Sequence, residues 1–177
     1  MNIKLVLNMF LLPNERRNIE FLTDELLVSN ELGEVTGGAT FQKKNGEVYK
    51  CEIYIRLNSK DLFDTFLSII KDVSFAKGSR VESSDRRIEL GDLEGLSLYL
   101  NTKDLPEDVY KNNSYDDLIT LLCENLGKDG VFLGTNIIDK FFVLYFYGNS
   151  FETIKEKIFP YLQDNSLCDD YRIKQVC

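Results

Sequence analysis

The chain has 177 residues, of which 44% are hydrophobic and 28% charged, and its formal net charge is −8. This composition is typical of a folded globular protein and excludes a disordered or low-complexity chain. The sequence contains no histidine, which excludes Ser-His-Asp and Cys-His catalytic arrangements and histidine-containing zinc sites.

The first half of the chain predicts the order strand, helix, strand, strand, helix, strand. Strands are expected at residues 3–10, 34–42, 47–57 and 79–90, and helices at residues 15–31 and 60–73. The apolar run at the N-terminus is too short for a signal peptide or a membrane span, so we expect it to remain as a strand. Asn45-Gly46 predicts a hairpin turn, and Ser59 predicts a helix cap.

The first predicted helix and the strand after it carry two further signals. The apolar stripe of the helix is expected at Ile19, Leu22, Leu26 and either Leu27 or Val28. Gly37-Gly38 lies in the next strand without the Lys-Ser/Thr of a P-loop. We therefore interpret this pair as a β-bulge rather than a phosphate site.

The second half of the chain repeats the same order of elements. Strands are expected at residues 96–101, 131–135, 140–147 and 171–176, and helices at residues 114–126 and 150–162. Ser114 and Ser150 predict the helix caps, and Gly127 predicts the end of the first helix. Asp116-Asp117 and Asp169-Asp170 lie where acidic residues usually cap or solvate rather than catalyse.

Sequence landmarks also recur at nearly constant spacing. Leu5-Val6-Leu7-Asn8 matches Leu98-Tyr99-Leu100-Asn101, and Tyr54 matches Tyr145, at offsets of 93 and 91 residues. This spacing indicates a duplicated structural unit. We predict an α+β fold of two tandem ferredoxin-like (βαββαβ) units, residues 1–90 and 91–177, related by a pseudo-twofold axis. In each unit, the helices are expected on one face of an antiparallel sheet.

The negative charge is concentrated in the second unit. Residues 1–90 carry 13 Lys/Arg and 14 Asp/Glu, whereas residues 91–177 carry 8 and 15, for net charges of −1 and −7. Such a field favours a cationic partner and disfavours nucleic acid and anionic membranes, although solubility alone also accounts for an acidic surface. The four cysteines form no C-x-x-C pair, so we expect a reducing, cytoplasmic setting without a metal or other cofactor.

The third strands of the two units predict different open sheet faces. In the first unit, Tyr54 lies on a polar open face, whereas in the second the open face carries an aromatic cluster formed by Phe141, Val143, Tyr145 and Tyr147. Such a cluster is expected to be covered by the other unit, by a loop or by a second copy in a homodimer, or to bind a partner protein. The strand superficially resembles the aromatic motif of RNA-recognition domains, but it lacks the small intervening residues and lies in the acidic unit. We therefore expect no RNA binding.

Two stretches resemble small bacterial proteins of the immunity-protein type. They are Leu32-Gly33-Glu34-Val35-Thr36-Gly37-Gly38-Ala39-Thr40, and the tyrosine-rich strand followed by Asn149-Ser150 and a helix with Pro160-Tyr161-Leu162. The resemblance implies an acidic, cytoplasmic protein that neutralises a toxin by occlusion and needs no catalytic residue.

These observations lead to two main functional hypotheses. The first is a non-enzymatic protein that binds another protein, such as a basic toxin, through Phe141, Val143, Tyr145, Tyr147 and Tyr54. The alternative is a regulatory module of the ACT-like kind, in which paired ferredoxin-like units bind a small molecule. An enzyme that uses carboxylates alone is a third alternative.

Overall fold

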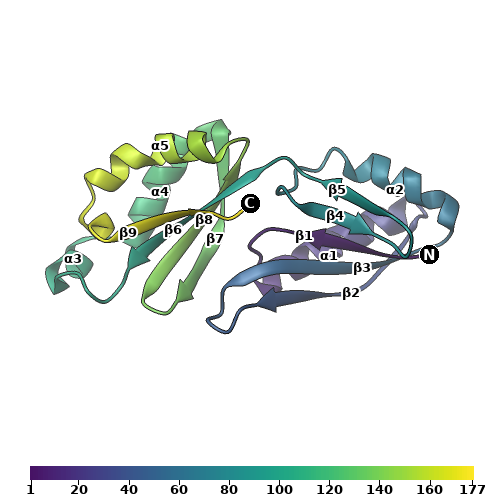
Figure 1. Ribbon diagram of the computed structural model, residues 1–177, viewed down its shortest axis with the longest axis horizontal. Helices are drawn as coiled ribbons and strands as arrows, with labels where there is room; N and C mark the ends of the chain where they lie inside the picture. The colour runs from purple at the N-terminus through teal and green to yellow at the C-terminus, as the bar shows by residue number, and fades with distance from the viewer. The chain divides into compact units, whose positions relative to one another are not determined.

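The computed structural model describes residues 1–177 and divides them into two units (Figure 1). The first unit contains residues 1–43 and 48–92, and the second contains residues 44–47 and 93–177. Each unit has its own antiparallel sheet with helices packed against it, and the two are described separately below.

Unit 1 is a ferredoxin-like unit with one added strand. Its elements are β1 (Asn2–Leu7), α1 (Pro13–Ser29), β2 (Gly33–Gln42), β3 (Val48–Leu57), α2 (Phe63–Ile70), β4 (Ser79–Glu82) and β5 (Arg87–Leu90). The strand order is β2-β3-β1-β4-β5, with antiparallel neighbours throughout. The single strand expected at residues 79–90 is therefore a β4–β5 hairpin. Ser83 accepts the backbone N–H of Arg86 at 3.0 Å and closes its turn.

Unit 2 repeats this plan without the added strand but with one added short helix, α3 (Glu107–Asn112), before the first long helix. Its other elements are β6 (Glu94–Asn101), α4 (Tyr115–Leu126), β7 (Gly130–Ile138), β8 (Phe141–Gly148), α5 (Phe151–Gln163) and β9 (Tyr171–Gln175). The strand order is β7-β8-β6-β9, and all neighbours are antiparallel. This order confirms the predicted α+β class and the tandem ferredoxin-like units.

The pairing registers match the sequence repeat. Leu5 lies opposite Ile53 in unit 1, and its counterpart Leu98 lies opposite Leu144 in unit 2. The bulge predicted at Gly37-Gly38 is present, because the β2–β3 register shifts between Val35 and Gly37. Unit 2 has a register shift between Phe132 and Gly134. In both units the glycine beyond the shift lies opposite the repeated tyrosine, Tyr54 or Tyr145.

The three predicted serine caps are present. Ser114 Oγ accepts the backbone N–H of Asp117 at the start of α4, and Ser150 Oγ accepts that of Thr153 at the start of α5, both at 3.3 Å. Ser59 accepts the N–H of Asp61 and begins a short 3-10 turn, Lys60–Leu62, which leads into α2. These bonds satisfy amide groups that a helix N-terminus leaves without a partner.

The helices of unit 2 close tightly over its sheet. Leu98 and Leu100 of β6 are buried beneath leucines of α4 and the buried residues Ile154, Ile158 and Leu162 of α5. The two helices pack against each other, and the Tyr161 hydroxyl of α5 donates a hydrogen bond to Asn125 Oδ1 of α4. The core of this unit is therefore continuous from the sheet to the helical layer.

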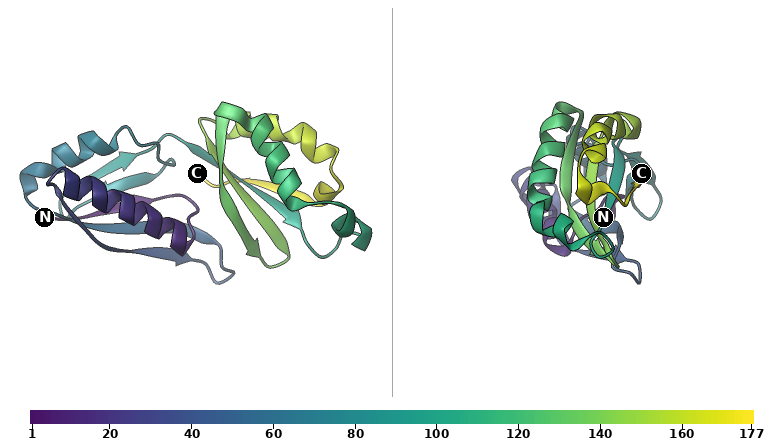
Figure 2. Two further views of the ribbon diagram at one scale, coloured as in Figure 1. Left: turned by 180° about the vertical axis from the view of Figure 1, so that it is seen from behind. Right: turned by 90° about the vertical axis from the view of Figure 1, so that its left-hand side faces the viewer.

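In unit 1 the first helix packs mainly on the edge strand β2 (Figure 2). Arg16 of α1 is 8% exposed, forms an ion pair with Glu20 and donates from Nε to Thr40 Oγ1 of β2 at 3.1 Å. Asp24 accepts the backbone N–H of Val35 at 2.7 Å. These polar contacts hold α1 over β2.

The apolar stripe predicted for α1 needs a correction. Leu27 is fully buried, but Leu22 and Val28 are 62% and 59% exposed. The side of the helix that meets β2 includes the paired Arg16 and Glu20 as well as Leu27. An ion pair can be buried when its charges are compensated, so the apolar pattern alone does not identify the buried side.

Candidate binding surfaces

The predicted residues of β8 alternate between the two sheet faces as expected. Leu144 and Phe146 belong to the core beneath the helices. On the opposite face, Val143, Tyr145 and Tyr147 are at most 2% exposed, whereas Phe141 is half-buried. Three of the four predicted open-face positions of β8 are therefore buried, which agrees with the alternative that this cluster is covered.

Part of this burial comes from the C-terminal residues of unit 2. The Val176 N–H donates to the Gly95 carbonyl at 2.9 Å, which places the chain end beside β6. A Cβ at Gly95 would lie 2.4 Å from Val176 Cγ2 and 2.7 Å from Tyr147 Cε1, so side chains from the tail and β8 crowd this glycine. Burial raises the pKa of Tyr145 well above its usual value.

The partly exposed end of this sheet face combines aromatic rings with cations. Lys174 Nζ lies 4.4 Å from the ring centre of Tyr99, and the Arg172 guanidinium lies 4.7 Å from that of Phe141. Tyr99 and Phe141 meet edge to face with centroids 6.0 Å apart. The cations of β9 thus cover rings that are neighbours across β6 and β8.

The helical side of unit 2 carries exposed carboxylates. Some have cationic neighbours, such as Glu107 with Lys111 at 2.7 Å and Glu152 with Lys155 at 3.4 Å. The others form what we call the acidic helical surface, a group of exposed residues without an ion pair in the structure: Asp108, Asp116, Asp117, Glu124 and Glu156. Asp116 and Asp117 lie in the first turn of α4, where negative charge is also favourable to the helix.

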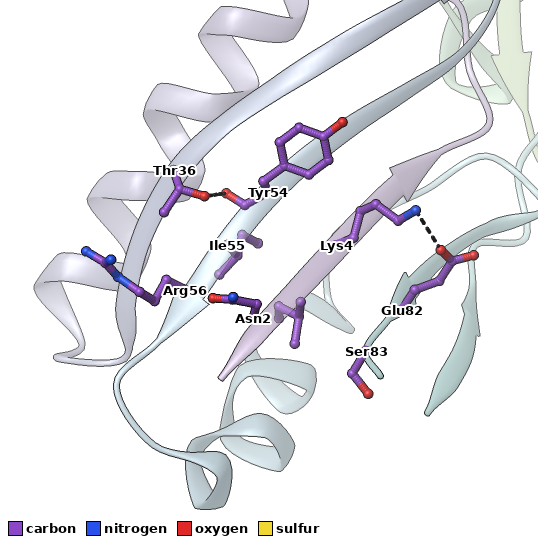
Figure 3. Close-up of a pocket in the computed structure, with 9 residues that line it drawn as sticks. Asn2, Lys4, Thr36, Tyr54, Ile55, Arg56, Glu82 and Ser83 are labelled. Carbon is purple, nitrogen blue, oxygen red and sulfur yellow. Dashed lines mark hydrogen bonds and ion pairs between the residues drawn. The ribbon is translucent and has the colours of Figure 1, made fainter. Parts of the chain in front are cut away.

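Tyr54, the fifth predicted residue, borders a hollow on the open face of unit 1 (Figure 3). The hollow has a volume of about 640 Å³ and is open to solvent. Tyr54 is 36% exposed, and its carbonyl accepts a hydrogen bond from Thr36 Oγ1 at 3.2 Å. Lys4 and Arg56 of neighbouring strands also border it, together with Glu82 and Ser83.

Ion pairs organise the charged groups around this hollow. Lys4 Nζ lies 3.0 Å from Glu82 Oε2 and 3.3 Å from Glu52 Oε1. Lys50 also contacts Glu52, at 2.9 Å, and Tyr54 donates to the same carboxylate at 3.1 Å. The Glu52 side chain is only 7% exposed, so this open face contains a nearly buried carboxylate held by two cations and a phenol.

The pKa shifts agree with this arrangement. Burial alone would raise the pKa of Glu52, but hydrogen bonds from Lys50, Lys4 and Tyr54 outweigh it, and the pKa is lowered. The hydrogen bond to Glu82 raises the pKa of Lys4. Both groups are thus stabilised in their charged forms.

The remaining reactive groups are dispersed. No three His, Cys, Asp or Glu residues come together as a metal-binding group. All four cysteines are free; Cys51 and Cys168 are buried, and burial raises the pKa of Cys168 to about 12. No helix combines the length and the apolar character required to cross a membrane.

Comparisons with known proteins identify no family for this chain. No protein-family model matches it, and no curated protein matches it. Solved structures with some similarity include a protein of Fusobacterium nucleatum subsp. nucleatum provisionally assigned as a monooxygenase, at 12% identity over 98% of this chain and 90% of that chain, with a TM-score of 0.33.

Two further structures show comparable similarity. An unknown protein from Galdieria sulphuraria is 11% identical over 98% of this chain and 95% of that chain, with a TM-score of 0.29. The first two RRM domains of the yeast poly(U) binding protein are 11% identical over 99% of both chains, with a TM-score of 0.28. Similarity this low says nothing about function, and the fold assignment given above follows from strand order and register.

Proposed function

We propose that this chain is a non-enzymatic protein that binds a basic protein through the acidic helical surface of unit 2. The observation that carries the proposal is the group of exposed carboxylates on α3, α4 and α5 without an ion pair. Glu124 of α4 and Glu156 of α5 are two of its members. A cationic partner would supply the missing counter-charges and would be attracted over long range.

The same surface offers an apolar anchor. Phe159 of α5 is 39% exposed and follows Glu156 by three residues, so both lie on neighbouring positions of one helix. Aromatic residues surrounded by charged groups contribute strongly to protein interfaces. The acidic charge would therefore raise the association rate with the partner, and Phe159 would lower the dissociation rate of the complex.

A toxin with a basic active surface is the partner class that fits this proposal and the resemblance to immunity-type proteins. Inhibition by occlusion requires a complementary surface and no catalytic group in the inhibitor. The decisive test combines purified chain with the products of neighbouring genes and measures both association and protection of cells that express those products. Failure of both readouts for every neighbouring product would refute the proposal.

Charge-reversal variants locate the interface. Glu124→Lys with Glu156→Lys changes the charge of the acidic helical surface, and Glu25→Lys with Asp72→Lys makes the same change on exposed positions of unit 1. Once a partner is identified, the Glu124→Lys and Glu156→Lys pair should lower its association rate about tenfold or more at low salt. An equal effect of both pairs would show that net charge matters and that this surface does not.

The hollow beside Tyr54 supports a second candidate function, the binding of a small polar molecule. Lys4 and Arg56 could hold a carboxylate, while Glu82 could hold an ammonium group. A thermal-shift screen with amino acids and nucleotides tests this role, because a ligand of the folded state raises Tm. Loss of any such shift in Lys4→Met would assign it to the hollow, and an unchanged shift would exclude it.

A further inference from the structure

A cavity in unit 1 lies between α1, α2 and the helix-facing side of β1. Its volume is about 300 Å³, and nine of its eleven lining residues are apolar. Leu5 and Leu7 of β1 form the floor, and residues of α1 and of the segment around the end of α2 form the walls. The cavity lies on the opposite face of the sheet from the hollow beside Tyr54.

In unit 2, the helices cover the corresponding strand differently. Leu98 and Leu100, the counterparts of Leu5 and Leu7, lie beneath a continuous layer in which α4 packs on α5. In unit 1, the Arg16–Glu20 pair and Asp24 hold α1 over β2 instead. α1 thus packs on β2, and the cavity lies between α1 and the end of α2, over β1.

The shape of the cavity favours an extended apolar molecule. Its lining on α1 runs from Ile19 to Leu26, a length of about 10 Å at 1.5 Å per residue. The floor residues Leu5 and Leu7 are at most 2% exposed, whereas the rim residues Leu22 and Val73 are 62% and 48% exposed. The cavity is therefore deep and has an apolar rim.

Its volume sets the size of the occupant. A dry cavity of about 150 Å³ holds a benzene molecule with six carbons, so this one has room for roughly ten to twelve. It is too small for a partner helix, whose diameter with side chains is about 10–12 Å. A single aliphatic chain fits both the length and the volume.

Two polar residues lie in the lining, one on each wall. Thr23 and Ser74 line the cavity; Thr23 is half-buried, and Ser74 is exposed. Ligand sites commonly combine apolar walls with a few polar groups that orient the ligand. The exposed Ser74 hydroxyl could bind the polar end of an otherwise apolar molecule.

We propose that unit 1 binds an amphiphile with an unbranched alkyl or acyl chain of about ten carbons, a size set by the cavity volume. The chain lies along α1 over Leu5 and Leu7, and the polar end bonds to Ser74, which is exposed at the rim. This site is independent of the acidic helical surface, since it lies in the other unit.

Calorimetric titration of the full chain with n-alkan-1-ols from hexanol to tetradecanol, below their solubility limits, tests the proposal. Affinity should rise about fourfold per added carbon until the cavity is full, near ten to twelve carbons, and then stop rising. Methyl NMR signals of Leu5 and Leu7 should shift on addition of decan-1-ol. Affinity that keeps rising with chain length, or shifts confined to other residues, would overturn the proposal.

A matched pair of variants on α1 locates the ligand. Thr23→Phe places a ring in the cavity, whereas Val28→Phe adds the same ring at an exposed position that does not line it. Thr23→Phe should weaken decan-1-ol binding at least tenfold, and Val28→Phe should leave it unchanged. Ser74→Phe serves the same purpose from the other wall if circular dichroism shows that Thr23→Phe is unfolded.

Two results would refute this assignment. One is undiminished binding in a folded Thr23→Phe or Ser74→Phe variant. The other is a sedimenting dimer that Thr23→Phe dissociates while decan-1-ol fails to bind, which would assign the cavity to a second copy. Charge reversal at Glu124 and Glu156 should not affect decan-1-ol, so failure here leaves the protein-binding proposal open to its own test.

Discussion

Substitution of Gly38 by alanine tests whether the polar contact between α1 and β2 governs the architecture of unit 1. A Cβ at Gly38 would lie 2.0 Å from Glu20 Oε1, 2.5 Å from Arg16 Nη1 and 2.5 Å from the Glu52 carbonyl oxygen. The first two atoms end flexible side chains, but the third belongs to the backbone of β3. The two side chains can turn aside only at the expense of their ion pair, whereas the third collision requires the β2–β3 pairing to adjust.

The expected cost follows from these contacts. Overpacking of a tight site costs about 1 to 3 kcal/mol, and separation of a largely buried ion pair adds up to about 3 kcal/mol. Alanine also makes the unfolded chain less flexible than glycine does, which offsets about 0.4 to 1 kcal/mol of this destabilisation. We expect Gly38→Ala to lower the free energy of unfolding by about 2 to 4 kcal/mol, as the balance of these effects.

Urea denaturation of Gly38→Ala in two backgrounds checks this reasoning. In the natural background the full loss is expected. In a chain that already carries Arg16→Ala and Glu20→Ala, the two colliding side-chain ends are absent, and the loss should shrink to the part that comes from the Glu52 carbonyl. An equal loss in both backgrounds, or a loss below about 0.5 kcal/mol in the natural one, would refute the role of the ion pair.

Three further predictions concern other buried groups. Because the pKa of Glu52 is lowered, its carboxylate stabilises the fold above its unfolded pKa near 4.5 and loses that effect as pH falls through the folded value. Urea titrations should therefore show that the free energy of unfolding of the natural chain exceeds that of Glu52→Gln by about 1 to 2 kcal/mol at pH 7, and that the difference shrinks as pH falls below 4.5. Asn101 is fully buried and donates to Asp104 and Asp170 at 2.9 and 2.6 Å, so Asn101→Ala should cost about 1 to 3 kcal/mol in the same assay; no loss would contradict the network. Cys168, with its pKa raised to about 12, should react with a thiol reagent at pH 8 only after denaturation, and rapid labelling of the folded chain would contradict its burial.

The sequence repeat predicted the backbone plan because its landmarks lie at structurally equivalent positions. Leu5 and Leu98 occupy the first strand of each unit, and Asn8 and Asn101 follow or end that strand. Each asparagine then fixes the segment before the fourth strand: Asn8 donates to the Lys77 carbonyl and Asn101 to Asp170. The repeated asparagine marks the end of the first strand and binds the segment before the fourth strand. Its position in the sequence therefore predicts the topology of each unit.

Surface assignment was harder to predict, because alternation identifies a face without identifying what covers it. Tyr147 was predicted on the open face of β8, and Phe146 lies on the helix-facing side, yet both are buried. The C-terminal residues near Gly95 contribute to this burial, and no local pattern of β8 contains that information. The net charge of residues 91–177, by contrast, predicted that unit 2 is acidic. The structure was needed to locate the unpaired carboxylates on the helices.

The cavity over β1 was not predictable from apolar periodicity. Leu22 has the spacing of a core residue but is exposed at the cavity rim, whereas Arg16 is buried. The contact that places α1 on β2 is the Arg16–Glu20 ion pair, which lies directly over Gly38 of β2. Such a contact depends on long-range geometry that a single helix does not encode.

The bulges in β2 and β7 affect how readily the chain aggregates with copies of itself. β2 and β7 are edge strands, and each has its register interrupted opposite the repeated tyrosine. An unbroken edge offers a template on which other chains can assemble, whereas a bulge twists the strand and disrupts that template. In β2, Asp24 also occupies the N–H of Val35. Two sheets have twice as many edge strands as one, and each edge strand could seed aggregation. The bulges disrupt the longest edge strand of each sheet, β2 and β7.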